Sequence, residues 1–376
     1  MKTATRRIVR PSRRLVVAVH SRSITVDMHT HVLPKSWPDF AARHGGEDWP
    51  WMRPIDGRAP GYGAIPGREE ASSRAMLMQG QQDFRPVISP CWDIAERLDD
   101  MDRDDIDHQI ISATPILFQW HRPAEAALDV ARHFNDQLLE MCAESPTGRL
   151  SALCQVPLQD VDLACEEASR AASAGHVGVQ IGNHDGPRDL DQRELLTFLG
   201  HCADEQIPVL VHPWDMMDSE DRLSRFMMKW TVGMPAETQL SIAAMILGGG
   251  FDVLEREDPE ERLKICFAHG GGSFSFLLGR LENAYLHRDI ARGKASRPPS
   301  AYVERFSCDS AVFDERSLRC LVDVMGVERV MLGSDYPFPL GEQRVGSLVR
   351  GAEFLSQADK DAILGGNARE FFNLSV

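Results

Sequence analysis

The sequence predicts an α/β protein, a (β/α)8 barrel of the TIM type with an insertion after the first strand. Two observations predict this fold. Short apolar runs alternate with segments of helical periodicity, which is typical of parallel strands joined by helices. The runs also number eight, as a closed barrel of this type requires. The expected strands are 24–29, 107–113, 150–155, 176–181, 207–212, 263–268, 305–309 and 329–334.

Helices are expected between these strands. Asp93 is a suitable N-cap for one of them, and a proline in the first turn precedes the helical apolar spacing of another. Residues 35–92 are different, because they are rich in Gly, Pro and Trp and have no clear period. Such a long insertion is commonly an active-site lid or a small subdomain. The expected helices are 93–105, 123–145, 160–174 and 236–254.

The domain organisation expected is one metal-dependent barrel over residues 24–376, with the insertion subdomain at about 35–92. Residues 1–23 contain seven Lys or Arg and no acidic residue, around a short apolar LVVAV. That apolar run is shorter than the ~7–15 residues of a secretory signal, so we expect a disordered basic extension. An Arg-rich organelle-targeting peptide is the alternative for this segment.

Composition excludes several classes of function. The formal charge of −15 and a pI near 5.3 argue against nucleic-acid binding, which requires a basic face. No stretch approaches the ~18 apolar residues of a membrane span. The eight cysteines form no CxxC pair and several lie in apolar runs, as expected of reduced thiols in the cytoplasm. Because the protein is acidic overall, an anionic substrate has to be held by local cations.

Polar side chains that stand at the ends of the expected strands predict a metal site. His29 and His31 are two residues apart on a strand, so both side chains point to the same side. His212 follows VLV, and Asp335 follows the apolar run VMLGS, where a buried carboxylate needs a cation or several donors. Each residue alone is weak support for a site. Together they give three histidines and one carboxylate with room for water, the open arrangement of catalytic zinc.

His269 ends the sixth expected strand and precedes three glycines, which leave space for a ligand near the backbone. We expect it to act as an acid or base beside the metal, because histidine titrates near neutrality. The alternative is a turn histidine whose glycines serve only the bend.

Several longer segments carry a resemblance to a known family. The chain resembles the 2-amino-3-carboxymuconate-6-semialdehyde decarboxylases, which are members of the amidohydrolase superfamily. The matching segments occur in order from residue 29 almost to the end of the chain, and HPWDM and DYPFPLGE are the most specific parts. These segments are HTHVLPKSWPD (29–39), FRPVISPCWD (84–93), VGVQIGNH (177–184), VHPWDM (211–216), WTVGMPAET (230–238), CFAHGGGSFSFLLGR (266–280) and GSDYPFPLGE (333–342).

The resemblance implies a zinc-dependent, non-oxidative decarboxylase with one Zn²⁺ per subunit and no organic cofactor. The reaction would convert 2-amino-3-carboxymuconate-6-semialdehyde to 2-aminomuconate-6-semialdehyde and CO₂, in tryptophan (kynurenine) or nitroaromatic catabolism. In the family pattern, His269 activates the zinc-bound water and moves protons, and Asp335 is counted with it in the catalytic set. The implied zinc ligands are His29, His31, His212 and Asp335.

The resemblance also implies three substrate-binding residues and a homodimer. Arg85 matches an arginine that pairs a carboxylate of the small dicarboxylate substrate, and Trp230 matches a tryptophan that lines the pocket. Arg280 matches an arginine donated across the dimer interface into the neighbouring site. Without the family pattern, Arg85 reads as a solvated loop residue, Arg280 as a helix-surface cation and Trp230 as a core aromatic.

Other functions of the same superfamily remain open at this point. One is a related decarboxylase or hydratase of hydroxybenzoate-like acids, which can share the metal ligands. Another is a mononuclear amide or lactone hydrolase; a binuclear hydrolase is disfavoured because VQIGNH (179–184) offers no bridging lysine. A non-catalytic zinc protein is the third. The chain departs from the family pattern in its N-terminal extension, in a longer segment 55–83 and in a slightly longer loop from His212 to Trp230.

Overall fold

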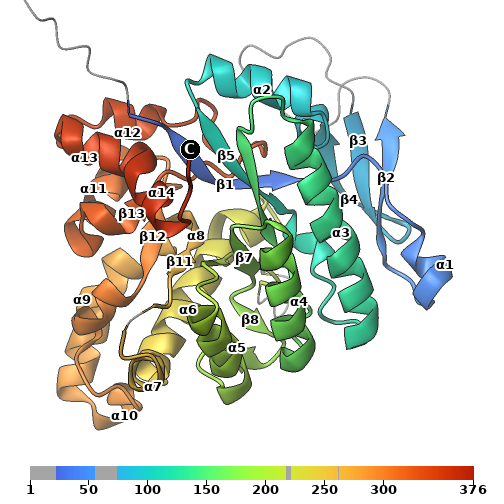
Figure 1. Ribbon diagram of the computed structural model, residues 1–376. Helices are drawn as coiled ribbons and strands as arrows, with labels where there is room; N and C mark the ends of the chain where they lie inside the picture. The colour runs from blue at the N-terminus through green and yellow to red at the C-terminus, as the bar shows by residue number, and fades with distance from the viewer. Residues whose placement is uncertain (1–22, 56–73, 217–221, 261) are drawn as a thin grey trace, which may run out of the picture.

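The computed structural model describes residues 23–55, 74–216, 222–260 and 262–376. Its centre is a sheet of eight parallel strands rolled into a nearly closed barrel, with helices packed around it (Figure 1). The predicted fold class is therefore confirmed. The strands in their order around the barrel are β1 (Val26–Val32), β5 (His108–Ala113), β6 (Leu150–Cys154), β7 (Gly178–Ile181), β10 (Val209–Val211), β11 (Ile265–Phe267), β12 (Ser307–Asp309) and β13 (Val330–Met331).

The first and last strands of the barrel meet along one seam. Met28 N donates a hydrogen bond to Leu332 O at 2.9 Å, and Asp335 N donates to His29 O at 3.0 Å. An isolated parallel bridge joins Thr30 to Tyr336. Backbone hydrogen bonds across this seam therefore place the end of β1 beside the segment that follows β13.

The eight predicted strands correspond to these eight, with ends that differ by a few residues. Alternate residues of a strand face the barrel interior and the surrounding helices. Leu210 belongs to a buried cluster with Met28 and Ile110, whereas its neighbours Val209 and Val211 belong to the larger cluster that includes helix residues. His212 follows by the same period on the side of Leu210, which directs it toward the inside.

Long helices connect the strands on the outside of the barrel. The side chain of Asp93 caps the helix that follows it by accepting from Glu96 N, as the sequence predicted, and Asp160 caps another by accepting from Leu163 N. The helices are α1 (Phe40–His44), α2 (Ile94–Arg103), α3 (Ala124–Glu144), α4 (Val161–Ala174), α5 (Arg193–Asp204), α6 (Met234–Leu247), α7 (Gly250–Glu257), α8 (Ala268–Gly271), α9 (Phe274–His287), α10 (Asp289–Arg292), α11 (Glu315–Met325), α12 (Ser347–Gly351), α13 (Gln357–Asp361) and α14 (Asn367–Phe371).

The helix predicted over 236–254 is wrong as a single element, because the structure breaks it into α6 and α7. The break lies at Gly248 and Gly249, where Gly249 has a left-handed φ of 78°. A Cβ on Gly248 would lie 2.6 Å from the backbone oxygen of Ala244, so this position also favours glycine. Apolar periodicity continued through the two glycines and concealed the break.

The segment between β1 and α2 contains α1 and a three-stranded antiparallel sheet, which lies beside the barrel (Figure 1). Its strands are β2 (Pro50–Ile55), β3 (Arg74–Gln79) and β4 (Gln82–Ile88). The sequence analysis found no period here and missed these strands. A short hairpin, β8 (His184–Asp185) with β9 (Arg188–Asp189), follows β7.

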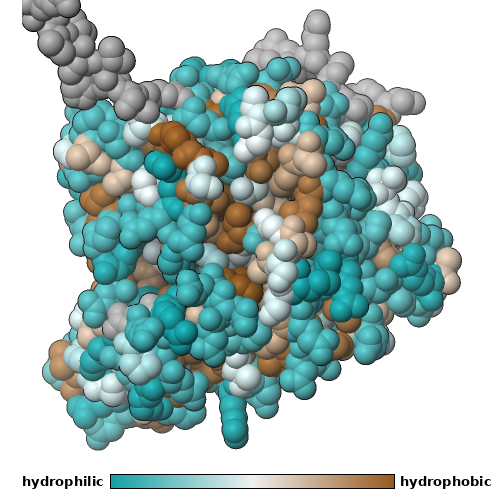
Figure 2. Space-filling view, in the orientation of Figure 1, coloured by the Kyte–Doolittle hydropathy of each residue, from teal (hydrophilic) through white to brown (hydrophobic). Residues whose placement is uncertain are grey.

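On the face drawn in Figure 2, hydrophilic side chains dominate the surface and hydrophobic ones gather mainly in the middle of the view. This agrees with helices that turn their apolar sides toward the barrel. Within the described residues, no helix is both long and apolar enough to cross a membrane. The predicted N-terminal extension lies outside the described residues, apart from Ser23.

Candidate metal centre and active site

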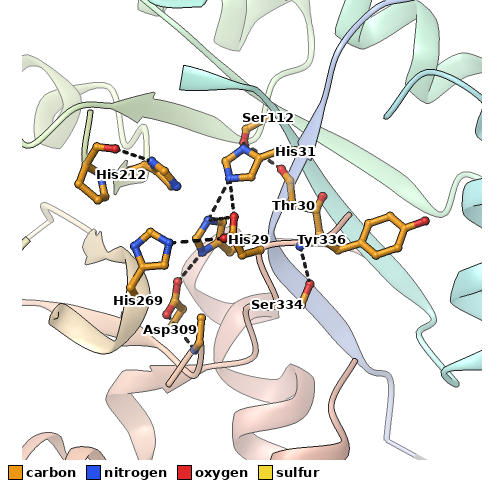
Figure 3. A network of polar contacts seen from close by, with 12 residues as sticks. His29, Thr30, His31, Ser112, His212, His269, Asp309, Ser334 and Tyr336 are labelled. Carbon is orange, nitrogen blue, oxygen red and sulfur yellow. Dashed lines mark hydrogen bonds and ion pairs between the residues drawn. The ribbon is translucent and has the colours of Figure 1, made fainter. Parts of the chain in front are cut away.

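The structure brings together the four residues predicted to bind metal. One potential ligand atom from each of them lies within 4.8 Å of all the others. His29 Nε2 lies 3.2 Å from His31 Nε2 (Figure 3). His31 Nε2 in turn lies 3.1 Å from Asp335 Oδ1. The histidines come from β1 and from the end of β10, and the aspartate follows β13. The group consists of His29, His31, His212 and Asp335.

Each histidine of this group is oriented through its Nδ1 atom. His29 Nδ1 lies 2.6 Å from Asp309 Oδ2, and His31 Nδ1 lies 3.3 Å from Ser112 Oγ. His212 Nδ1 lies 3.1 Å from the carbonyl oxygen of Pro213. The Nε2 atoms of His29 and His31 therefore face the shared centre.

The donor atoms fit a divalent metal ion. Ligand atoms about 2.0–2.2 Å from one ion stand roughly 3–4 Å apart, as several of these atoms do. His212 Nε2 is buried and has no hydrogen-bond partner among the described residues, which is costly unless the nitrogen meets a cation. Three imidazoles and one carboxylate also form the donor set of an open, catalytic type of site.

Burial keeps two of the imidazoles neutral. It lowers the pKa of His31 to about 4, although the hydrogen bond and charge of Asp335 partly oppose this shift. Burial, together with the neighbouring histidines, holds the pKa of His212 well below its ordinary value. Neutral imidazole is the form that binds metal, so these two residues are ready to do so at neutral pH.

The carboxylates of the site are ionised. Burial raises the pKa of Asp335, but the neighbouring His269 and His31 outweigh that effect and hold it well below its ordinary value. Burial lowers the pKa of His29, whereas the hydrogen bond and charge of Asp309 raise it further than burial lowers it. The hydrogen bond from His29 likewise outweighs burial at Asp309 and lowers the pKa of that carboxyl.

His269 lies beside the metal-binding group. Its Nε2 is 3.9 Å from Asp335 Oδ2, and its ring centroid is 5.1 Å from that of His29 and 5.0 Å from that of His212. The residue has a left-handed φ of 55°, which is strained for a non-glycine residue and occurs preferentially at functional sites. The structure therefore places His269 next to three of the four candidate metal ligands.

The three glycines after His269 serve the close packing of this turn. All three have positive φ values. A Cβ on Gly270 would lie 2.3 Å from Val312 Cγ1, and one on Gly272 would lie 2.0 Å from Pro235 O. Glycine is thus required at these two positions for space as well as for backbone conformation.

Arg85 and Trp230 also meet close to the metal-binding group. The guanidinium carbon of Arg85 lies 5.1 Å from the Trp230 ring and 4.8 Å from the Phe338 ring. The Phe338 ring in turn lies 5.3 Å from that of His31. One aromatic layer therefore separates Arg85 from a candidate metal ligand. The sequence analysis did not single out Phe338, although it lies within the matching segment DYPFPLGE.

Arg280 is exposed on α9 and makes no hydrogen bond or ion pair with the metal-binding group in the described part of the chain. Asp309, the partner of His29, was also missed by the sequence analysis. It ends the predicted strand 305–309, so the rule that found the metal ligands could have found it.

A parallel eight-stranded barrel with a His₃Asp group at the C-terminal ends of its strands defines a class of metal-dependent barrel enzymes. A family model described as amidohydrolase matches residues 26–374, and the chain belongs to that family. A 2-amino-3-carboxymuconate-6-semialdehyde decarboxylase of Dictyostelium discoideum is 37% identical over 355 residues, covering 94% of this chain and 92% of the relative. One of Caenorhabditis elegans is 31% identical and covers 94% of this chain and 95% of the relative.

Two solved structures share the fold. The 5-carboxyvanillate decarboxylase of Sphingomonas paucimobilis has a TM-score of 0.73 at 25% identity, covering 94% of this chain and 99% of that one. The Novosphingobium aromaticivorans 5-carboxyvanillate decarboxylase, solved with manganese, has a TM-score of 0.70 at 21% identity, covering 94% and 96%. Together with the two relatives, these findings identify the chain as a metal-dependent decarboxylase of the amidohydrolase superfamily.

Proposed function

We propose that this enzyme converts 2-amino-3-carboxymuconate-6-semialdehyde to 2-aminomuconate-6-semialdehyde and CO₂, without an organic cofactor. Two relatives of that activity match over 94% of the chain. The observation that carries the proposal is the position of Arg85, one aromatic ring away from His31. An acidic protein needs such a guanidinium to bind a dicarboxylate. The pathway would be tryptophan (kynurenine) or nitroaromatic catabolism, in the cytoplasm, as eight free cysteines suggest.

The metal we propose is one Zn²⁺ per subunit, held by His29, His31, His212 and Asp335. Three imidazoles and a carboxylate suit zinc. Manganese is the second candidate, because a solved relative was crystallised with it. Metal analysis of protein purified without chelators, followed by reconstitution of the apoprotein with each ion, distinguishes the two.

In the proposed mechanism, Arg85 binds a substrate carboxylate and Trp230 and Phe338 hold the conjugated chain against the site. A bound divalent cation supplies Lewis acidity and lowers the pKa of water. His269 moves a proton to the carbon that carries the leaving carboxylate, and Asp335 holds the His269 ring in place from 3.9 Å. The bond to that carboxylate then breaks, CO₂ leaves, and the electron pair returns to the conjugated chain.

We further propose a homodimer in which Arg280 reaches the neighbouring site. Arg280 is exposed on α9, and the same helix and the following α10 carry large apolar side chains that are unusually exposed. Their exposed fractions are 83% for Phe276, 58% for Leu286 and 87% for Ile290. Exposed apolar patches of this kind mark protein interfaces.

The decisive assay adds freshly made 2-amino-3-carboxymuconate-6-semialdehyde to zinc-loaded protein and follows its absorbance together with CO₂ release. We expect enzyme-dependent CO₂ release before spontaneous ring closure to quinolinate. 5-Carboxyvanillate and hydroxybenzoates are assayed in parallel, with amides and lactones for the hydrolase alternative. If only an aromatic acid is turned over, the substrate has to be reassigned. If only an amide or a lactone is turned over, the proposed decarboxylation of 2-amino-3-carboxymuconate-6-semialdehyde is wrong.

The proposed role of His269 is tested with His269→Ala. We expect turnover to fall by about 10²–10⁴-fold, the usual contribution of a general acid or base, while metal content stays at the wild-type level. His201→Ala is the matched control, because His201 binds Ser169 between α4 and α5. Near wild-type turnover of His269→Ala would remove His269 from the mechanism.

The donated Arg280 is tested by mixing two inactive variants, Arg280→Ala and His269→Ala. If each site takes one arginine from its partner, a mixed dimer contains one site with both residues intact. We expect activity to reappear on mixing, together with a dimer by light scattering. A monomer, or an Arg280→Ala variant of full activity, would contradict the proposed dimer site.

A further inference from the structure

One buried carboxylate, Asp309, contacts both the candidate metal ligand His29 and the turn that carries His269. Asp309 has no exposed surface, and its two oxygens point in different directions. Oδ2 lies 2.6 Å from Nδ1 of the His29 ring (Figure 3). Oδ1 accepts hydrogen bonds from the backbone N–H groups of Gly270 at 2.9 Å and Ala311 at 3.0 Å. Asp309 thus links a candidate metal ligand to the residue that follows His269.

The contact with His29 determines where that imidazole carries its proton. An ionised carboxylate can only accept, so His29 Nδ1 must donate to it. The lone pair of the neutral ring is then on Nε2, the atom 3.2 Å from His31 Nε2 at the shared centre. Carboxylate partners of this kind also make the imidazole a more basic ligand.

The contact with Gly270 holds the turn that presents His269. His269 and Gly270 both lie in the left-handed region, at φ 55° and 61°. A left-handed non-glycine residue is costly and persists only where its surroundings fix it. Asp309 Oδ1 accepts a hydrogen bond from the buried N–H of Gly270, the residue directly after His269. Val312 fills the space that a Cβ on Gly270 would occupy.

We propose that Asp309 is a positioning residue that sets, at the same time, the tautomer of the metal ligand His29 and the strained turn that carries His269. It touches neither substrate nor the reacting atoms. This inference rests on the metal-dependent activity proposed above. Its two effects can be separated, because each depends on a different oxygen of the same side chain.

Asp309→Asn changes only the oxygen that faces His29. The amide oxygen can still accept from Gly270 and Ala311, and the opposite rotamer would point NH₂ at two N–H donors. The NH₂ group therefore donates to His29 Nδ1, which places the ring proton on Nε2 and blocks metal binding there. We expect Zn²⁺ or Mn²⁺, titrated alone against a chelating dye, to bind 10–100-fold more weakly.

Asp309→Ala removes both acceptors, so the comparison of the two variants tests the turn. At saturating metal, Asp309→Asn should keep most of the wild-type kcat. The kcat of Asp309→Ala should be at least tenfold lower than that of Asp309→Asn. Asp129→Asn is the matched control, because Asp129 also pairs with a histidine, His44, on the surface far from the site. The control should leave metal affinity and kcat unchanged.

A measurement on the wild type avoids any question of folding in the variants. In ¹⁵N-histidine spectra of the zinc-loaded protein, His29 should carry its proton on Nδ1. A proton on Nε2, or wild-type metal affinity in folded Asp309→Asn, would overturn the tautomer role. Equal kcat in both variants at saturating metal would overturn the role in the turn. Metal binding is measured without substrate, so failure of the substrate assignment is seen separately in the CO₂ assay.

Discussion

Arg97 is the largest side chain with no exposed surface in the described part of the chain. It stabilises the candidate metal site through the backbone of His31. It donates to His31 O at 2.5 Å, to Gln109 Oε1 at 2.9 Å and to Pro90 O at 3.2 Å. Its guanidinium carbon also lies 4.8 Å from the Tyr336 ring, across the seam of the barrel. One arginine therefore connects β1, β5 and the loop after β13.

Arg97→Met should destabilise the protein strongly. Several buried acceptors lose their donor in this variant, and each unsatisfied group costs about 1–3 kcal/mol. We therefore expect the free energy of unfolding to decrease by at least about 3 kcal/mol. Urea unfolding of the metal-loaded protein measures this difference. Arg43→Met on the exposed surface should change stability by no more than about 0.5 kcal/mol. An Arg97→Met effect as small as that of the control would contradict the supporting role of Arg97.

His108 gives the stability a pH dependence that is separate from the metal site. Burial lowers its pKa to about 4, and its Nε2 lies 2.9 Å from Ser151 Oγ. The unfolded chain takes up the proton near pH 6.5 and the folded chain only near 4, so the unfolded state binds more protons between these values. Stability therefore falls as the pH decreases through this window.

We expect His108→Gln to remove part of this acid sensitivity. Between pH 7 and pH 4, the stability of the wild type should fall relative to the variant by up to about 3 kcal/mol, the equivalent of the shift in pKa. Urea unfolding of both proteins at several pH values measures the difference. A constant difference across this range would show that His108 titrates normally in the folded state.

At the scale of elements, the short helix α8 and the glycine that caps it, Gly272, show how tightly the active-site turn is packed. Gly272→Ala combines a positive φ of 65° with a Cβ 2.0 Å from Pro235 O, a backbone atom that cannot move easily. We expect a loss of stability of at least about 2 kcal/mol, from the conformational strain alone and before the clash is added. Thermal and urea unfolding measure it.

Gly200→Ala in α5 is the control for this prediction. A Cβ there meets no atom within 4 Å, and alanine is preferred to glycine inside a helix. This variant should be more stable than the wild type by roughly 0.5–1 kcal/mol. If both alanines had the same effect, the crowding at Gly272 would not matter for stability.

Sequence patterns predicted the barrel elements because each apolar run ended in a polar residue or a turn. The same rule found the four candidate ligands, since the ends of parallel strands gather at one edge of a barrel. It could not find the break at Gly248, because apolar spacing passed through it. It also missed β2, β3 and β4, whose side chains alternate poorly between buried and exposed.

The surroundings of the ligands were harder to predict than the ligands. The layer formed by Arg85, Phe338 and His31 depends on how the small sheet docks on the barrel, which no local pattern encodes. The resemblance to a known family supplied Arg85 and Trp230 as site residues. The strand-end rule could have found Asp309 as a site residue, but sequence alone did not say that its side chain would face His29.

At the scale of the whole molecule, a metal ion at the predicted site would join three strands that are remote in sequence. Binding to the folded state alone stabilises it by about 2.7 kcal/mol when the free ion is at 100 times its Kd. We therefore expect the midpoint of urea unfolding to fall after treatment with a chelator and to recover on adding Zn²⁺. Equal midpoints with and without the chelator would contradict metal binding at this site.

The seam between β1 and β13 also bears on how the protein is made. Asp27 and Ser334 are hydrogen-bonded partners separated by 307 residues, and the candidate ligands His29 and Asp335 stand next to them. A chain emerging from the ribosome exposes His29 and His31 long before Asp335 is synthesised. The enzyme can therefore acquire a complete metal centre only after Asp335 has been synthesised, and a chain that stops before this residue lacks one of the four candidate ligands.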